Sequence, residues 1–193
     1  LTDVAHKNGV TVGTLMSIPF GNSVYLTSWR SDVYSRVLFR LTQKSGDKYI
    51  YAEPLVRMMK YYGVNGIGFN SEFRTSSSVM TQLSEFFVAC HKEAEKLNWK
   101  FEVHWYDGTS DDGQIHFDGG LSYHNQKIFG DKDNIATDML FANYNWGPGH
   151  LSASVNTAKR LGRSSFDYYA GFDIQGRGLR QASWSALLDN DIS

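Results

Sequence analysis

The chain has 193 residues, a formal net charge of −1 and 41% hydrophobic residues, enough for one folded domain with a sizeable core rather than a disordered chain. The near-neutral charge gives no basic surface for nucleic acid, and no apolar stretch is long enough to cross a membrane as a helix. The single cysteine, Cys90, excludes an intrachain disulfide.

Helix and strand signals alternate from the start of the chain. Residues 2–8 have the pattern of a helix that ends at Gly9, and residues 10–20 follow as a strand. The next clear helix covers residues 53–62, because a Glu-Pro pair suits its first turn and Gly63 supplies a stop. The inward face of this helix is predicted to carry Leu55, Met58, Met59 and Tyr62.

The middle of the chain repeats this order. Residues 64–70 form the second predicted strand, and a long helix follows at residues 78–97, which Ser76 to Ser78 can cap. Residues 100–107 form the third strand, and residues 108–134 are polar and rich in Gly and Asp. The buried stripe of the long helix is predicted to contain Val79, Leu83, Phe86, Phe87, Cys90, Ala94 and Leu97.

The last third adds two more strands. Residues 138–146 form the fourth, and residues 150–161 form a helix that ends at Gly162. Its inward residues are predicted to be Leu151, Val155, Ala158 and Leu161. Residues 166–178 are predicted to be the fifth strand with its loop.

Strands separated by helices predict an α/β fold with a parallel sheet covered by helices. Five such units favour a (β/α)8 TIM-type barrel, with an open doubly wound sheet as the alternative. The sequence has no G-x-G-x-x-G after its first strand and no P-loop, which disfavours the nucleotide-binding forms of the doubly wound fold. A full barrel typically needs about 250 residues. We therefore expect a single domain over residues 1–193 that is a partial barrel, with strands missing at one or both ends.

Polar and aromatic residues gather where four predicted strands end. In a parallel barrel the carboxyl ends of the strands form the site, so these residues are expected to lie together. The four groups are Asn70-Ser71-Glu72, Trp105-Tyr106-Asp107, Asn143-Tyr144-Asn145-Trp146, and Asp173 with Gln175 and Arg177. A single group of this kind would be explained by a helix cap or a loop hydrogen bond. Four groups at the same position, each at the end of its strand, favour a binding site.

The segment "GVNGIGFNSEF", residues 63–73, gives the clearest chemistry. Side chains alternate along a strand, so Asn70 and Glu72 are expected to point into the barrel mouth above small glycines. A carboxylic acid among aromatic side chains is a usable proton donor near neutral pH, which makes Glu72 a candidate general acid. Asn70 cannot be a nucleophile, but it could orient a substrate 2-acetamido group that attacks the anomeric carbon instead, with Tyr106 on the other side.

These motifs resemble glycoside hydrolase family 85, the endo-β-N-acetylglucosaminidases that cut between the two core GlcNAc residues of N-glycans. The resemblance covers most of the chain in order and approximate spacing. It rests on the segments "DVAHKNGVTVGT", "GVNGIGFNSEF", "VHWYDG", "GGLSYHNQ", "FANYNW" and "FDYYAGFDIQGRG". The sequence departs from the family at "NSEFRTSSS", and the family's opening and closing strands have no match in it.

The resemblance implies a role for each matching residue. Glu72 corresponds to the general acid/base, Asn70 to the residue that orients the acetamide, and Tyr106 to the tyrosine that assists at the oxazoline stage. Residues implied in substrate binding are Trp146, Asn143, Tyr123, Asn125, Asp107, Asp173 and Arg177. For Asp107, Asp173 and Arg177, an Asp–Arg ion pair that holds the barrel rim together is an equally good interpretation.

Two other functions remain open from the residues. A chitinase-like retaining glycosidase would use Asp107 or Asp173 as its second carboxylate, about 5 Å from the first. A non-catalytic glycan-binding barrel would keep the aromatic residues without turnover. We expect no metal, because His104, His116, His124 and His150 lack ligand spacing, and we expect "DGTSDDG", residues 107–113, to be a solvated turn rather than a calcium loop.

The expected partner is an N-glycan or glycopeptide substrate, with no cofactor, no nucleic acid and no membrane span. The sequence leaves the glycan type and the oligomeric state open. A secreted or extracytoplasmic bacterial location is favoured, because extracellular glycans are an accessible substrate, and a cytoplasmic one is the alternative.

Overall fold

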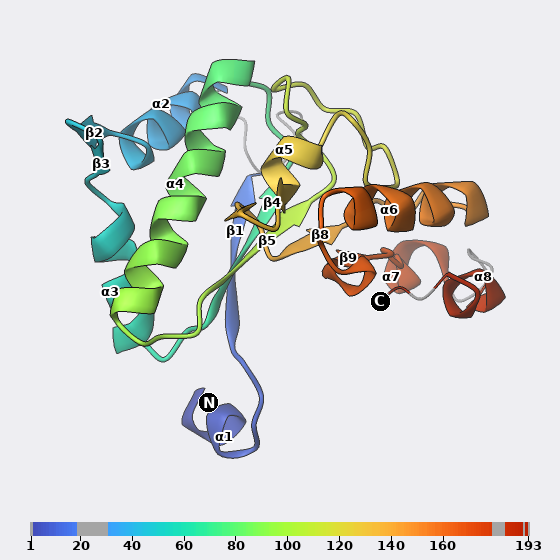
Figure 1. Ribbon diagram of the computed structural model, residues 1–193, viewed down its shortest axis with the longest axis horizontal. Coiled ribbons are helices and arrows are strands. Elements are labelled where there is room, and N and C mark those ends of the chain that lie inside the picture. The colour runs from blue at the N-terminus through green and yellow to red at the C-terminus, as the bar shows by residue number, and fades with distance from the viewer. Residues whose placement is uncertain (1, 19–30, 179–183, 191, 193) are drawn as a thin grey trace.

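A parallel sheet forms the centre of the molecule (Figure 1). The computed structural model describes residues 2–18, 31–178, 184–190 and 192. Within these residues the main sheet has five strands in the order β1-β4-β5-β8-β9, and every neighbouring pair is parallel. The strands are β1 (Gly13–Ile18), β4 (Gly66–Ser71), β5 (Glu102–Tyr106), β8 (Met139–Phe141) and β9 (Tyr168–Tyr169).

The order of the strands in the sheet is also their order in the chain. A doubly wound sheet reverses its strand order at a switch point, whereas a barrel is wound in one direction. Over the described residues the sheet runs without a reversal, which is the winding of a (β/α) barrel. The predicted α/β class and parallel sheet are confirmed.

Helices and two small hairpins connect these strands. The longer helices are α2 (Ser31–Leu41), α3 (Ala52–Tyr61), α4 (Ser77–Lys96) and α6 (Pro148–Arg160). The shorter ones are α1 (Thr2–Lys7), α5 (Gln126–Phe129), η2 (Ser165–Asp167), α7 (Ile174–Arg177) and α8 (Trp184–Leu188). The hairpins pair β2 (Lys44–Ser45) with β3 (Lys48–Tyr49), and β6 (Gly130–Asp131) with β7 (Asn134–Ile135). Of the described helices, none has the length and apolar character needed to cross a bilayer.

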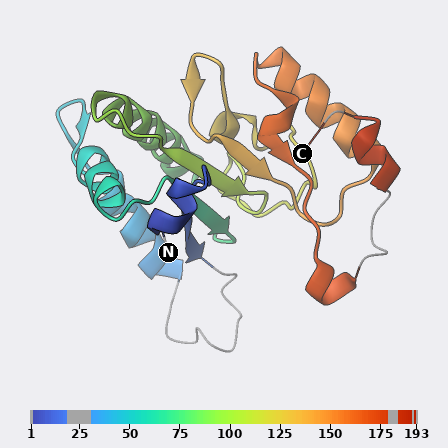
Figure 2. The ribbon, with the colours of Figure 1, turned by 90° about the horizontal axis from the view of Figure 1, so that it is seen from below.

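The core lies between one face of the sheet and the helices that cover it. Figure 2 shows α4 and α6 on the same side of the sheet. Phe69 of β4 and Trp105 of β5 are buried there against Phe87 of α4, with ring centroids 5.1 and 6.2 Å from that of Phe87. The face of β4 predicted to meet the helices is therefore confirmed by Phe69 and by Ile67, which is 5% exposed.

The opposite face of the sheet is more open. Leu15, in register with Gly68, is 67% exposed, and Tyr169 of β9 is 38% exposed. Gly68 leaves room on this face, because a side chain there would fill the space beside Leu15, with its Cβ 3.4 Å from the Leu15 Cδ1 atom. This is the face that a closed barrel turns towards its interior.

The last two predicted strands are much longer in the prediction than in the structure. The segment 138–146 contains a strand of three residues, and 166–178 contains one of two followed by α7. Some of the apolar residues in these segments lie in turns rather than strands. One such turn begins at Asp173, whose carboxylate accepts a hydrogen bond from the Gly176 N–H at 2.8 Å. Apolar content alone did not separate these turns from strands.

The helix predicted at 53–62 begins at Ala52, and its buried face differs from the prediction. Val56 and Met59 are buried, whereas Met58 and Tyr62 are 53% and 63% exposed. For α4 the prediction is better, since the Ser76 hydroxyl caps the helix by accepting from the Val79 N–H at 3.4 Å. Its buried residues are Met80, Leu83, Phe86, Phe87, Cys90 and Ala94.

A buried arginine ties the second half of the fold together. Arg163 is 8% exposed and follows α6. Its guanidinium donates to the carbonyl oxygens of residues 129, 137 and 138 at 2.8, 3.1 and 3.1 Å, and its Nε donates to an Asp167 carboxylate oxygen at 2.9 Å. It also lies 4.1 Å from the centroid of the Phe129 ring. One side chain thus joins α5, the start of β8 and the approach to β9.

Candidate active site

Asn70 lies at the carboxyl end of β4, and Glu72 is the first residue after that strand. Burial alternates through this segment, with Phe69, Ser71 and Phe73 buried and the two polar residues between them half-buried. The same alternation puts Asn70 and Glu72 away from the helix-covered core. The strand hydrogen bonding stops at Ser71, and the Glu72 N–H instead lies 3.2 Å from the Asn70 carbonyl oxygen.

The loop after β5 holds the chain on both sides of Glu72. The Thr109 N–H donates to the Ser71 carbonyl at 2.7 Å, and the Thr109 hydroxyl lies 3.1 Å from the Phe73 N–H and 2.6 Å from the Phe73 carbonyl. Gly108 packs against the same point, since a Cβ added to it would meet the Ser71 carbonyl oxygen at 2.2 Å and the Glu72 Cγ at 3.5 Å. Sequence reasoning missed both residues, and the Gly-Thr pair after Asp107 was the available signal.

The prediction that residues 107–113 form a solvated turn is wrong, because most of this segment is buried. Asp107, Thr109 and Ser110 are each 1% exposed. The Thr109 hydroxyl bonds to the backbone of residues 71 and 73, and the Asp107 carboxylate accepts from two backbone N–H groups and one amide. The buried Ser110 hydroxyl, by contrast, has no partner among the described residues. Of this segment, Asp112 and only part of Asp111 reach the surface.

A cavity of about 420 Å3 opens on the uncovered face of the sheet. Asn70 and Tyr106 both line it, and His104 and Tyr144 also contribute polar groups. Gly68 contributes space at the floor, as the sequence predicted. The remaining lining residues are Gly13, Thr14, Leu15, Phe69, Trp105, Met139 and Phe141. A mainly apolar, aromatic hollow with a few polar groups is the usual form of a small-ligand site.

Tyr106 and Asn143 meet at the ends of β5 and β8. The Tyr106 hydroxyl donates to the Asn143 Oδ1 at 3.1 Å, and the same oxygen accepts from the Tyr144 N–H at 2.7 Å. The Tyr106 and Tyr144 rings have centroids 6.4 Å apart. Two of the predicted site residues are therefore in direct contact, and the amide fixes the orientation of the phenol beside the cavity.

Asp107 and Asn125 form a buried network below this pair. The Asp107 carboxylate accepts from the Gly119 N–H at 2.6 Å, from the Asn125 amide at 3.1 Å and from the Asn143 N–H at 3.4 Å. Burial raises the pKa of Asp107 to about 7, although the hydrogen bonds from Gly119 and Asn143 act in the opposite direction. Both side chains are 1% exposed, so in this structure they organise the loop.

Of the predicted site residues, Asn70 and Tyr106 line the cavity, whereas Glu72 is not among its lining residues and lies just past the end of β4. Trp146, Asp173 and Tyr123 do not line it either. The Trp146 indole donates to the Gly171 carbonyl at 2.7 Å and packs edge-on against Phe172. Asp173 caps α7 and is half-buried, and Tyr123 is 75% exposed on the loop before α5. The side chain of Arg177 lies outside the part of the chain whose side chains are described. Their roles in substrate binding stay predictions.

The histidines differ from one another in their surroundings. His104 contacts Glu102 at 3.3 Å, and His150 accepts from the Gly147 N–H at 3.0 Å at the start of α6. His116 and His124 instead stack on each other, with Asp118 beside them. Among the described residues, these three form a group whose ligand atoms could hold a metal ion.

Changing Gly108 to Ala is expected to lower the free energy of unfolding by about 1–3 kcal/mol, because the new methyl group overlaps a backbone carbonyl that cannot turn away. It should also move Glu72, whose Cγ lies beside the new atom. Urea unfolding measures the first effect. The matched control is Gly149→Ala in α6, where nothing lies within 4 Å of the added Cβ, and equal unfolding midpoints for the two variants would contradict the prediction.

Comparison with known proteins gives consistent matches. A family model described as Glycosyl hydrolase family 85 matches residues 1–189. The chain is 28% identical over 179 residues to a cytosolic endo-beta-N-acetylglucosaminidase of Gallus gallus, which covers 92% of this chain and 22% of that protein. It is 28% identical over 193 residues to cytosolic endo-beta-N-acetylglucosaminidase 1 of Arabidopsis thaliana, covering 99% of this chain and 25% of that protein.

A solved structure matches the fold. The glycoside hydrolase domain of Endo-D from Streptococcus pneumoniae R6 superposes with a TM-score of 0.80 at 25% identity, over 96% of this chain and 29% of that one. The chain thus spans only 22% to 29% of the length of these relatives. The similarity extends over nearly the whole of the shorter chain, so it concerns the sheet and the strand ends described above.

Proposed function

The chain belongs to glycosyl hydrolase family 85, and from that premise we propose that its protein is an endo-β-N-acetylglucosaminidase. The substrate would be the core of an N-glycan, and the bond cut would be the β1,4 linkage between its two GlcNAc residues. In the proposal, the five described strands are part of a (β/α)8 barrel, and the uncovered face of the sheet is part of its interior. The observation that carries the proposal is the placement of Asn70 and Tyr106 on one cavity at the strand ends.

The first proposed step uses the substrate's own acetamide. Its carbonyl oxygen attacks the anomeric carbon, the bond to the departing GlcNAc oxygen breaks, and Glu72 gives its proton to that oxygen. The product is a bicyclic oxazolinium ion whose positive charge is shared with the acetamide nitrogen. The Asn70 carboxamide oxygen accepts a hydrogen bond from that N–H, which strengthens as the charge develops. Tyr106, oriented by Asn143, supports the acetamide from the neighbouring strand.

The second proposed step reverses the first. Water attacks the anomeric carbon from the side the leaving group vacated, and the Glu72 carboxylate takes the proton of that water. The bond between the anomeric carbon and the acetamide oxygen breaks and the acetamide is restored. Two inversions give retention of configuration, and Glu72 ends protonated as it began.

A second carboxylate nucleophile is less well supported. Asp107 is 1% exposed, and its oxygens already accept from two backbone N–H groups and one amide. Asp173 caps α7 through the Gly176 N–H. An amide beside the cavity, rather than a carboxylate, favours the substrate-assisted route over the chitinase-like alternative with its second acid.

Changing Asn70 to Ala is expected to reduce hydrolysis of a high-mannose glycopeptide by about 10²–10³-fold, because one hydrogen bond to developing charge is lost. Mass spectrometry of the products measures turnover, and the proposed cut leaves a single GlcNAc on the peptide. The matched control is Asn156→Ala, an exposed amide on α6, which should retain full activity.

Three outcomes would argue against the proposal. Normal turnover in Asn70→Ala would mean that Asn70 does not position the substrate acetamide. A product with both core GlcNAc residues on the peptide removes the assigned linkage. Glycan binding by the unaltered protein without any cleavage favours the non-catalytic binding barrel.

A further inference from the structure

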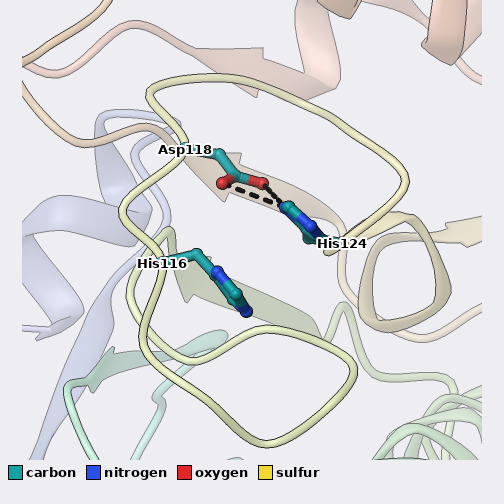
Figure 3. A group of neighbouring side chains, drawn as sticks. All are labelled: His116, Asp118 and His124. Atoms are coloured by element: carbon teal, nitrogen blue, oxygen red, sulfur yellow. Dashed lines mark hydrogen bonds and ion pairs between the residues drawn. The ribbon is translucent and has the colours of Figure 1, made fainter.

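The loop between β5 and α5 brings three potential metal ligands together. Figure 3 shows the side chains of His116, Asp118 and His124 gathered on this one loop. One ligand atom from each residue, a ring nitrogen or a carboxylate oxygen, lies within 4.8 Å of the other two. The sequence spacing alone did not suggest this group, because the loop has to turn back on itself before His124 meets the other two.

The contacts inside the group are close. The two imidazole rings are stacked, with centroids 4.4 Å apart and an angle of 9° between their planes. The Asp118 carboxylate lies 2.9 and 3.2 Å from the Nδ1 atom of His124, and it accepts from the Ser122 hydroxyl. Two nitrogen ligands and one oxygen ligand therefore lie beside one another, and the carboxylate is held in place by a neighbouring hydroxyl.

A fourth residue, Asp112, contacts one of the proposed ligands without being a ligand itself. The Asp112 carboxylate lies 2.8 Å from the Nε2 atom of His116. A carboxylate on one ring nitrogen orients the imidazole and makes its other nitrogen a better ligand, which is a common support around metal-binding histidines. The side chain of Asp112 is 51% exposed, so it can follow a movement of the ring.

We propose that His116, Asp118 and His124 bind one Zn²⁺ ion. Two imidazoles and one carboxylate suit zinc, whereas calcium and magnesium prefer oxygen ligands alone. Three protein ligands leave a fourth position for water. Ligand atoms about 2.0–2.2 Å from a shared ion must approach one another more closely than 4.8 Å. Each ring nitrogen binds an ion in the plane of its own ring, so the two stacked rings must turn out of their parallel arrangement to share one ion. The side chains of His116 and His124 are 30% and 28% exposed, which leaves them room to turn.

The bound ion would clamp the loop beside the candidate active site. His116 and Asp118 lie early in the loop, and His124 is followed by Asn125, whose amide donates to Asp107. Gly119, which follows Asp118, donates to the same carboxylate. Zinc would therefore fasten the two segments that hold Asp107, without contacting the cavity lined by Asn70. This proposal does not depend on the glycosidase activity.

Metal binding can be measured directly. The protein, freed of metal with a chelator, is titrated with ZnSO4 in a calorimeter near pH 7.5, and its unfolding temperature is recorded with and without zinc. We expect one ion per chain and an unfolding temperature that rises with zinc concentration, because an ion that binds only the folded state stabilises it. With Co²⁺ as the probe, a visible absorption band should report nitrogen and oxygen ligands.

Variants separate this site from adventitious zinc. His124→Ala and Asp118→Asn should each weaken zinc binding by about 100-fold or more and abolish the cobalt band. Asp118→Asn keeps an acceptor for the Ser122 hydroxyl, so it tests the ligand without disrupting the loop. His150→Asn is the control histidine, and its zinc response should match that of the unaltered protein. The proposal is overturned if the folded protein binds no zinc, or if both cluster variants bind it unchanged, in which case the two His–Asp pairs serve packing alone.

Discussion

Glu72→Gln is expected to lower turnover of a high-mannose glycopeptide by about 10²–10⁴-fold, the usual contribution of a positioned general acid and base. Glutamine keeps the size and polarity of the side chain, but it cannot give a proton to the leaving oxygen or take one from water. Binding of the glycan should remain close to that of the unaltered protein, since the cavity on the sheet is not altered. Kinetics under saturating substrate measure the first effect, and calorimetry with the intact glycopeptide measures the second.

The control for this variant is Glu95→Gln, an exposed carboxylate on α4, which should leave turnover unchanged. Two results would count against the assigned role. Turnover within a factor of two of the unaltered protein would mean that Glu72 transfers no proton. Loss of glycan binding together with turnover would mean that its main role is structural.

Arg163→Met is expected to lower the free energy of unfolding by about 2–4 kcal/mol, because a buried charged donor to several carbonyl oxygens is removed. The methionine fills much of the volume but removes the guanidinium donor from three carbonyl oxygens, two of them in buried hydrogen bonds, and removes the ion pair with Asp167. The contact with the Phe129 ring loses its charge as well. Urea unfolding should show a lower midpoint with an unchanged slope.

Arg160→Met is the matched control, because this arginine lies near the end of α6 and is exposed. Its guanidinium donates to the Gln126 side chain at 2.6 Å, and loss of such a surface bond should change stability by less than about 0.5 kcal/mol. Arg163→Lys should fall between the two, because one ammonium group cannot reach all of the acceptors. Equal midpoints for Arg163→Met and Arg160→Met would contradict the structural role of Arg163.

Local sequence signals predicted the parts of the fold that depend on period and burial. The apolar stripe from Leu83 to Ala94 follows helical spacing, so α4 was located to within one residue at each end. The alternation at Ile67 and Phe69 likewise identified the buried face of β4. The short strands β8 and β9 were overestimated, because apolar residues in the turns that follow them are buried by tertiary packing.

The candidate site was predictable only in part. Asn70 and Tyr106 belong to regular strands, whose ends meet by the geometry of a parallel sheet, and both line the cavity. Thr109 and Gly108 act across 36 or more residues of sequence on the segment around Glu72, and no local pattern encodes that contact. The pairing of His116 with His124 likewise depends on the path of an irregular loop.

Each strand of the main sheet after β1 pairs with the main-sheet strand that comes before it in the chain. The paired residues are 53, 36, 35 and 28 positions apart (Gly13 with Gly66, Gly66 with Glu102, His104 with Met139, Leu140 with Tyr168), so no pairing has to close a loop across the whole chain. During synthesis, β4 can add to β1 as soon as it leaves the ribosome, and every later strand meets a finished edge. Within the described residues, the sheet can therefore grow by adding each new strand to the edge formed by the main-sheet strand before it.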